Sequence, residues 1–286
     1  MTQQFFKEEG LEVEWLKFDA GAPEIAAMVS GDLHFGYIGQ GALALCANGQ
    51  ADVVSISHYT SSEAILVRAS SGIKTFEDLI GKKIGTEIGT SASVLITMAC
   101  EKYGVDEKSL NIINMPIENA ISAFIGGSID AIVSWGADIY RIKTTMDEPV
   151  EEVVKTADFQ DVVPFIGSWI AVRDYIEKNN DTCLRFIRAL HKCYDYRYNN
   201  LDATIQAASE FGKSVHHGLT YEDLYSEKDQ LIFFPVSDLT EWLKSGKVLN
   251  DYQLVLDNMI EAGAVEGGNV NDYVRVNLMK EALGIQ

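Results

Sequence analysis

The chain has 286 residues, of which 42 are acidic and 23 are basic, so its formal net charge at pH 7 is -19. This balance argues against a nucleic-acid-binding protein, because no basic stripe is present to replace the counterions of phosphate groups. Hydrophobic residues make up 47% of the chain, which is enough for two lobes with cores of their own. No apolar run is long enough to cross a membrane.

Strands and helices alternate through the first part of the chain. Residues 1–10 are typical of a helix that ends at Gly10, and residues 11–18 alternate between apolar and polar side chains as a strand does. A short helix at 25–29, a strand at 33–38, a helix that ends at residue 47 and a strand at 51–57 follow. This β-α-β-α-β order predicts a parallel sheet.

A second series begins after a strand at 64–69. Residues 82–87 are a predicted strand, and after a Gly-Thr-Ser turn the apolar spacing of Val94, Leu95 and Met98 predicts a helix. Two more strands, at 110–115 and 131–134, enclose a helix at 121–125, and a returning strand covers 165–172. The acidic segment 147–152 is expected to be solvated surface, and the chain from residue 174 onward is expected to be mostly helical.

Two strands, one near Leu66 and one near Ile170, are expected to cross between two lobes. Lobe 1 would hold residues 1–67 and 169–286, and lobe 2 would hold residues 68–168. Each lobe is predicted to be a doubly wound α/β sheet flanked by helices. Such lobes can close about a hinge around a ligand in the cleft.

Ligand-binding residues are expected just beyond the carboxyl ends of the strands. The helix start after the strand at 82–87 offers N–H groups and hydroxyls to an anionic head group, although it can equally be an ordinary helix cap. The first lobe has an equivalent glycine-rich turn and an earlier loop, which can equally be a tight turn and a surface turn. The residues at these three places are Gly89, Thr90, Ser91 and Ala92, then Gly39, Gln40 and Gly41, then Asp19, Ala20 and Gly21.

Aromatic and acidic residues complete the candidate site. Trp135, at a strand end, is interpreted as a wall of the cleft or else as a core residue, and Asp138 as the partner of a ligand amine or else as a helix cap. Trp169, on the returning strand, is interpreted as a ligand contact or as packing at the hinge. No metal, cofactor or catalytic group is predicted: His216, His217 and Asp223 lack a ligand set with recognisable spacing, as do the four dispersed cysteines.

Several motifs in this order resemble the periplasmic-binding-protein-like solute receptors of bacterial ABC importers. Within them the chain is most similar to the nitrate, sulfonate and taurine family, which also contains proteins for thiamine-pyrimidine precursors. The motifs lie at 5–11, 28–32, 36–39, 73–84, 89–91 and 123–131, followed by Trp135. The resemblance covers residues 5 to about 173 strongly and the remainder loosely.

The resemblance also shows three departures. The chain starts inside what would be the first helix of the family, so an N-terminal segment, with the signal sequence, is expected to be missing from it. Trp135 is followed by Gly136, Ala137 and Asp138, where the family often has a proline two residues on. Glu87 adds a carboxylate beside the ligand turn, and with Asp138 it would suit a zwitterion such as taurine or a pyrimidine with an amino group.

The resemblance implies a non-enzymatic, monomeric receptor outside the cytoplasm, in the periplasm or as a cell-surface lipoprotein. It would capture an alkanesulfonate or a taurine-like sulfonate by hinge closure and present it to the permease subunits of an importer. The alternative within the fold is a receptor for a thiamine-pyrimidine precursor or another small nitrogen compound. An enzyme that makes the thiamine pyrimidine, which would need an iron site rich in His and Cys, and a sensor domain rank below both.

Overall fold

The computed structural model of the protein describes residues 2–159, 163–214 and 218–285. The chain divides into two compact units: unit 1 is Met1–Tyr59, Val162–Thr204 and Ile232–Gln286, and unit 2 is Thr60–Asp161 and Ile205–Leu231. These units differ from the expected lobes, which placed the boundaries at 67/68 and 168/169 and assigned residues 205–231 to lobe 1. That segment belongs with unit 2 because helix α10 (Tyr221–Ser226) packs on helix α6 (Gly136–Thr145) and Ser61 N–H donates to Gln230 O.

Unit 1 is built on a sheet with the strand order β1-β8-β2-β9. The strands are β1 (Phe35–Ile38), β8 (Phe165–Ala171), β2 (Asp52–Thr60) and β9 (Leu231–Ile232). Strand β8 runs antiparallel to β1, with Tyr37 opposite Trp169 and Ile38 opposite Ser168. The prediction of a wholly parallel sheet is therefore wrong, because the returning strand inserts beside β1.

The predicted strand at 11–18 is also wrong. These residues carry the alternating pattern but belong to no strand of the described structure. A segment of alternating apolar and polar residues becomes a strand only where a neighbouring strand shares its backbone hydrogen bonds. In this segment Trp15 instead packs its ring against Phe6 and Trp169, at centroid distances of 5.7 and 6.4 Å.

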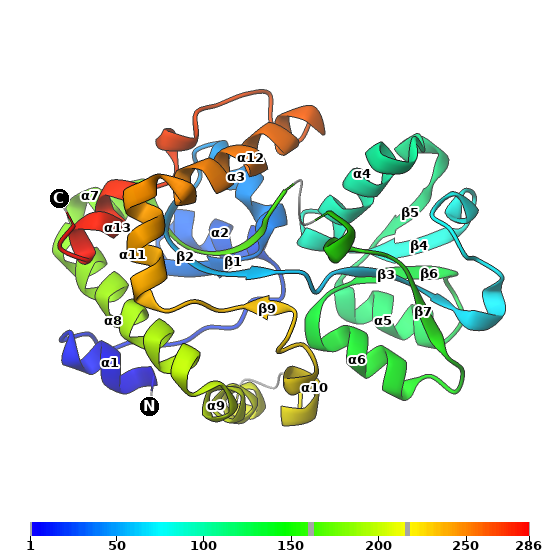
Figure 1. Ribbon diagram of the computed structural model, residues 1–286, viewed down its shortest axis with the longest axis horizontal. Helices are drawn as coiled ribbons and strands as arrows, with labels where there is room; N and C mark the ends of the chain where they lie inside the picture. Colours follow the sequence, from blue (N-terminus) through cyan, green and yellow to red (C-terminus); the bar gives the residue numbers. More distant parts are fainter. Residues whose placement is uncertain (1, 160–162, 215–217, 286) are drawn as a thin grey trace. The chain divides into compact units, whose positions relative to one another are not determined.

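Helices surround the sheet of unit 1 (Figure 1). Strand residues Val54 and Ala171 form a core with Cys183, Leu184 and Ile187 of the long helix α8. Asp52, at the start of β2, is buried and accepts hydrogen bonds from Arg173 and Arg275. The helices of unit 1 are α1 (Thr2–Glu8), α2 (Gly21–Ser30), α3 (Leu43–Ala47), α7 (Arg173–Lys178), α8 (Asn180–Asn199), α11 (Val236–Ser245), α12 (Lys247–Glu261) and α13 (Val276–Ala282), and α9 (Leu201–Ser214) continues into unit 2.

Unit 2 contains a sheet with the strand order β5-β4-β6-β3-β7. Strand β4 is parallel to β5 and β6, whereas β3 is antiparallel to β6 and β7. Helix α4 (Ser91–Tyr103) covers one face, and α5 (Ile117–Ile125) and α6 cover the other (Figure 1). The strands are β3 (Ala64–Arg68), β4 (Lys83–Thr86), β5 (Asn111–Asn114), β6 (Ala131–Ser134) and β7 (Val150–Lys155).

The acidic segment expected at the surface contributes in part to the sheet, because Val150, Glu151 and Glu152 belong to β7. Glu151 and Glu152 lie opposite Val67 and Leu66 of β3, and their side chains form ion pairs with Lys74 and Lys143. The segment also stays in part at the surface, since the Glu151 side chain is 42% exposed and β7 is an edge strand.

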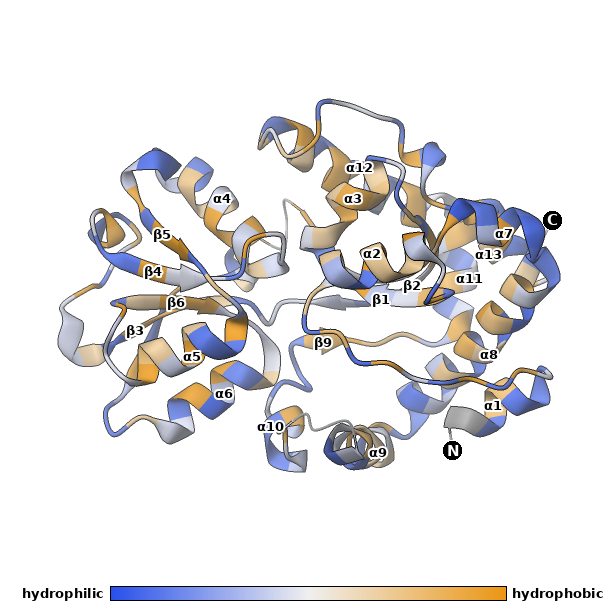
Figure 2. Ribbon diagram, turned by 180° about the vertical axis from the view of Figure 1, so that it is seen from behind, coloured by the Kyte–Doolittle hydropathy of each residue, from blue (hydrophilic) through white to orange (hydrophobic). Residues whose placement is uncertain are grey.

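One core of unit 2 lies between the sheet and helices α5 and α6. Leu66, Ile132, Ile121, Phe124 and Ile142 are all buried there. Figure 2 shows hydrophobic residues along β3 and β6, as their sequences AILVR and AIVS require. In the part of the chain that the structure describes, no helix combines the length and apolar character needed to span a membrane.

Candidate functional site

Side chains near the ends of β1 and β2 approach one another across β8, the strand that lies between them in the sheet of unit 1. Gly167, near the start of β8, leaves the space that they use: a Cβ at this position would lie 2.5 Å from the Tyr37 hydroxyl and 2.8 Å from Cε1 of His58. The Tyr37 hydroxyl is 3.4 Å from His58 Nε2, and His58 Nδ1 is 3.2 Å from Ser57 Oγ. Polar groups of two strand ends are thus connected beside Gly39, where the sequence predicted a ligand turn.

Arg197 joins these groups from the last turn of helix α8. Its Nη2 donates to Ser57 O at 2.6 Å, and its guanidinium lies 4.0 Å above the Phe233 ring and 5.0 Å above the Tyr194 ring. Its Nε is buried without an acceptor, and no carboxylate pairs with Arg197 among the residues that the structure describes. Burial lowers the pKa of Arg197, but a guanidinium remains charged at any physiological pH.

Aromatic rings line the neighbourhood of this cation. Trp169 packs edge-on against Tyr37 at a centroid distance of 5.6 Å, and its buried Nε1 has no acceptor among the described residues. Burial, reinforced by the nearby charge of Arg197, lowers the pKa of His58 to about 3, so His58 is neutral. We call Tyr37, Ser57, His58, Trp169 and Arg197 the Arg197 cluster. It offers one positive charge and several hydrogen-bond donors without an internal anion.

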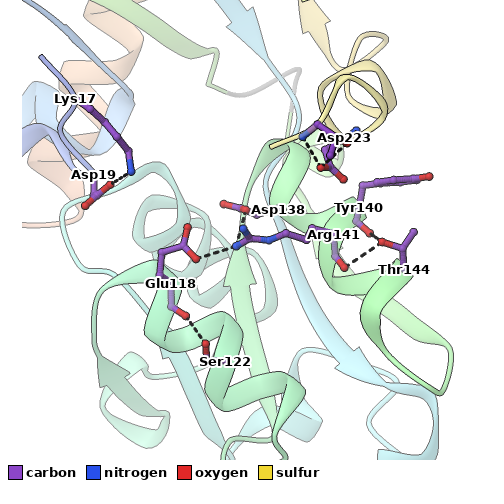
Figure 3. A network of polar contacts seen from close by, with 10 residues as sticks. Lys17, Asp19, Glu118, Ser122, Asp138, Tyr140, Arg141, Thr144 and Asp223 are labelled. Atoms are coloured by element: carbon purple, nitrogen blue, oxygen red, sulfur yellow. Dashed lines mark hydrogen bonds and ion pairs between the residues drawn. The ribbon is translucent and has the colours of Figure 1, made fainter. Parts of the chain in front are cut away.

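The structure places the predicted residues of unit 1 in different roles. Asp19 forms an ion pair with Lys17 (Figure 3), and Ala20 precedes α2 without capping it. Gly21 is a packing position, since an added Cβ would lie 2.6 Å from Ala42 Cβ and 3.0 Å from Ile38 Cγ2. Gly39, by contrast, faces open space.

Gln40 is buried, and its side-chain oxygen accepts from Ile166 N–H at 3.0 Å. It therefore ties the turn to β8. Gly41 lies in the short 3-10 helix Gln40–Ala42, which joins this turn to α3.

The turn at the start of α4 holds the predicted residues Gly89, Thr90, Ser91 and Ala92. Thr90 does not cap the helix: its hydroxyl donates to Glu87 O at 2.6 Å. Ser91 hydrogen-bonds the carboxylate of Glu63, which also accepts from the Thr156 hydroxyl at 2.8 Å. Ala92 is buried, whereas Gly89 is exposed with φ at 85°. A carboxylate of the protein itself thus lies at this helix start.

A carboxylate of the protein also lies at the helix start after β6. Trp135 is half-buried against the core of unit 2, and Gly136 follows it with φ at 56°. The Glu227 carboxylate accepts from Ala137 N–H and contacts the position that a Cβ on Gly136 would take. Burial, then the charges of Asp138 and Glu63, raise the pKa of Glu227 to about 7.

Glu87 and Asp138, whose carboxylates were predicted to suit a ligand amine, have partners within unit 2. Asp138 forms an ion pair with Arg141 at 3.1 Å, and Arg141 also pairs with Glu118 at 2.9 Å (Figure 3). Glu87 accepts from Ile117 N–H at 2.9 Å and so caps helix α5. The carboxylates of Asp138 and Glu87 therefore already bind other groups of the protein.

Five residues of interest were not predicted from the sequence: Tyr37, His58, Arg197, Glu63 and Glu227. Tyr37 lies two residues before the predicted Gly39 turn, so the strand-end rule could have included it. The other four stand in ordinary polar surroundings in the sequence, and only their burial in the fold distinguishes them. His216 and His217 lie outside the described residues, and Asp223 forms a capping box with Thr220. No cluster of His, Cys, Asp and Glu suited to a metal occurs among the described residues.

The two sheets flanked by helices define an α/β periplasmic-binding-protein fold. The crystal structure of the periplasmic aliphatic sulphonate binding protein SsuA from Escherichia coli is similar to this chain, with a TM-score of 0.68 at 20% identity over 95% of this chain and 85% of that chain. The desulfurization enzyme DszB is also similar, with a TM-score of 0.65 at 13% identity over 99% of this chain and 94% of that chain. At such identities these structures show the fold alone.

Residues 1–203 match the family described as NMT1/THI5 like, and the chain belongs to that family. A binding protein of Brucella abortus is 32% identical over 211 residues, which cover 73% of this chain and 64% of that protein. The taurine-binding periplasmic protein of Escherichia coli is 28% identical over 192 residues, or 65% of this chain and 57% of that protein. The matches thus span less than two thirds of the length of these relatives.

Proposed function

We propose that this chain is the solute-binding protein of an ABC importer and that it binds a small organic sulfonate outside the cytoplasm. The observation that carries this proposal is Arg197, a largely buried guanidinium with no carboxylate partner among the described residues. A buried charge without a counter-ion is costly, so an anionic ligand at this position gains the interaction that the fold leaves unmade. A sulfonate offers a permanent negative charge and three acceptor oxygens.

The rest of the Arg197 cluster suits the same ligand. Trp169 Nε1 and the Tyr37 hydroxyl can donate to sulfonate oxygens, and the rings of Tyr37 and Trp169 can pack on a short alkyl chain. The names of the E. coli relatives, a taurine-binding and a sulphonate-binding protein, support this class of solute. The proposed partners are the permease subunits of the importer, and stimulation of ATP hydrolysis in a reconstituted importer by the loaded chain would test this.

The protonation state of the cysteine thiols favours a receptor over an enzyme. Burial raises the pKa of Cys100, Cys183 and Cys193 to about 11 in each case and that of Cys46 further. These thiols therefore stay protonated at neutral pH and are poor nucleophiles and metal ligands.

The test is calorimetric titration with taurine, ethanesulfonate, nitrate and hydroxymethyl-pyrimidine. In Arg197→Met the side chain keeps its apolar stem over Phe233 but loses the charge. We expect sulfonate affinity to fall by about 10- to 100-fold, the range for a hydrogen-bonded charge. The control is Arg188→Met on the same helix, where the arginine pairs with Glu9. Failure of the unaltered chain to bind any sulfonate, or full affinity in Arg197→Met, would refute the proposal.

A further inference from the structure

A chain of hydrogen-bonding groups within unit 1 connects Arg197 to the Tyr37 hydroxyl. Arg197 Nη1 donates to Ser57 Oγ at 3.4 Å, and Ser57 Oγ lies 3.2 Å from His58 Nδ1. His58 Nε2, the other ring nitrogen, lies 3.4 Å from the Tyr37 hydroxyl oxygen. The first of these bonds has a fixed direction, because a guanidinium can only donate. The direction of the other two depends on which nitrogen of the His58 ring carries the proton.

The surroundings of Ser57 determine the position of this proton. Ser57 is 3% exposed, and among the described residues its hydroxyl bonds only Arg197 Nη1 and His58 Nδ1. Since Nη1 has no lone pair to offer, His58 Nδ1 is the acceptor that these contacts provide for the Ser57 proton. If Nδ1 carried the ring proton instead, a buried hydroxyl would be left without an acceptor, which is rare in folded proteins.

The charge of Arg197 favours the same tautomer of His58. Nδ1 is the ring nitrogen that faces Ser57, and Ser57 is in direct contact with the guanidinium. A lone pair on this side of the ring is attracted by the positive charge, whereas an N–H group would be repelled. Burial and the charge of Arg197 lower the pKa of His58 to about 3, so the ring holds a single proton at neutral pH. That proton is therefore expected on Nε2.

The His58 ring is also held in its orientation. A Cβ on Gly167 would lie 2.8 Å from Cε1 and 3.2 Å from Nδ1, so the ring occupies the space that this glycine leaves. Phe233 packs edge-on against the ring at a centroid distance of 5.5 Å, and the Tyr37 ring lies at 6.0 Å with an interplanar angle of 19°. In this orientation an Nε2–H group donates to the Tyr37 oxygen.

We propose that His58 is a positioning residue: Ser57 and Arg197 hold it as the Nε2–H tautomer, and its Nε2–H donates to the Tyr37 oxygen, so that Tyr37 O–H donates to the sulfonate. In the opposite tautomer Tyr37 would donate its proton to His58 and present only lone pairs to the anion, which would repel it. The inference rests on the proposed function, because the acceptor is the same solute. Arg197 thus supplies the positive charge and also sets, through Ser57 and His58, the direction of a second donor.

The first test is the tautomer itself, read from nitrogen NMR spectra of the unaltered chain labelled at histidine, at pH 7 and without solute. The ring nitrogens of His58 are assigned through bonds from its backbone. We expect a protonated Nε2 and an unprotonated Nδ1. A proton on Nδ1, or on both nitrogens, would overturn the inference and leave the sulfonate proposal standing.

The second test is calorimetric titration with ethanesulfonate. Tyr37→Phe should weaken binding by about tenfold, as the loss of a hydrogen bond to a charged group would, and His58→Leu by about 3- to 10-fold. Because His58 acts through Tyr37, the double variant should bind within about twofold of Tyr37→Phe alone. His58→Gln, whose amide can both donate and accept, should recover most of the affinity. His34→Leu, at an exposed histidine of unit 1, is the matched control.

The outcomes separate the two proposals. Full ethanesulfonate affinity in His58→Leu, or additive losses in the double variant, would overturn the role of His58 while sulfonate binding itself stands. Binding of no sulfonate by the unaltered chain would overturn both. The NMR measurement needs no substitution, so it decides the question even if the His58 variants lose their fold.

Discussion

Glu24 should make the stability of unit 1 depend on pH. Its side chain is 8% exposed, contacts the position that a Cβ on Gly36 would take, and accepts from Tyr37 N–H at 2.5 Å. Burial raises the pKa of Glu24 from 4.5 to about 7, and the Tyr37 hydrogen bond offsets part of that effect. The folded chain therefore binds this proton more tightly than the unfolded chain does.

The sign and size of the effect follow from proton linkage. The contribution of Glu24 is complete below about pH 4.5 and is lost as the pH rises through about 7. A difference of about 2.5 pKa units at 1.36 kcal/mol per unit gives a loss of at most about 3 kcal/mol in the free energy of unfolding. In Glu24→Gln this pH-dependent loss should disappear, since the amide does not ionise but its oxygen can still accept from Tyr37.

Urea unfolding at pH 5, 6, 7 and 8, followed by tryptophan fluorescence, measures this effect. Three of the four tryptophans, Trp15, Trp169 and Trp242, lie in unit 1. With a slope of about 3 kcal/mol/M, the midpoint of the unaltered chain should fall by about 1 M more than that of Glu24→Gln between pH 5 and 8. Glu266→Gln, at an exposed position, should follow the unaltered chain. Parallel pH profiles for Glu24→Gln and the unaltered chain would refute the reasoning.

Two further predictions concern unit 1. Asp52→Asn should lower the free energy of unfolding by about 3 to 5 kcal/mol in urea melts, because a buried carboxylate that holds Arg173 and Arg275 is lost; a loss below about 1 kcal/mol would contradict this. Gly21→Ala should cost about 1 to 3 kcal/mol by overpacking against Ile38 and Ala42, whereas Gly39→Ala should leave stability unchanged. If Gly39→Ala is fully stable but binds the solute more weakly, the ligand approaches Gly39 closely. Equal melting temperatures for Gly21→Ala and Gly39→Ala would contradict the packing argument.

The sequence was a good guide to elements whose signal is local. The strands at 33–38, 51–57, 131–134 and 165–172 are present within a few residues because each carries a short apolar run between turn residues. Residues 11–18 alternate between apolar and polar side chains but form no strand, since a strand needs a neighbouring strand that the pattern cannot supply. For the same reason the antiparallel position of β8 beside β1 could not be predicted.

The charged residues of the candidate site could likewise be predicted only in part from the sequence. The helix start at Ser91 was predicted from local signals and is present, whereas α6 begins at Gly136 and not after a cap at Asp138. The carboxylates at these two helix starts, Glu63 and Glu227, come from distant parts of the chain, so their role depends on the fold. Arg197 is likewise one of several arginines on α8, and only its burial without a carboxylate partner distinguishes it from Arg185 and Arg188.

The most direct test of the account is a crystal structure of the chain with taurine bound. We predict sulfonate oxygens within about 3 Å of the Arg197 guanidinium, with Nε no longer without an acceptor. A sulfonate bound at another place, with Arg197 still in the contacts with Ser57 and Phe233 described above, would contradict the central claim.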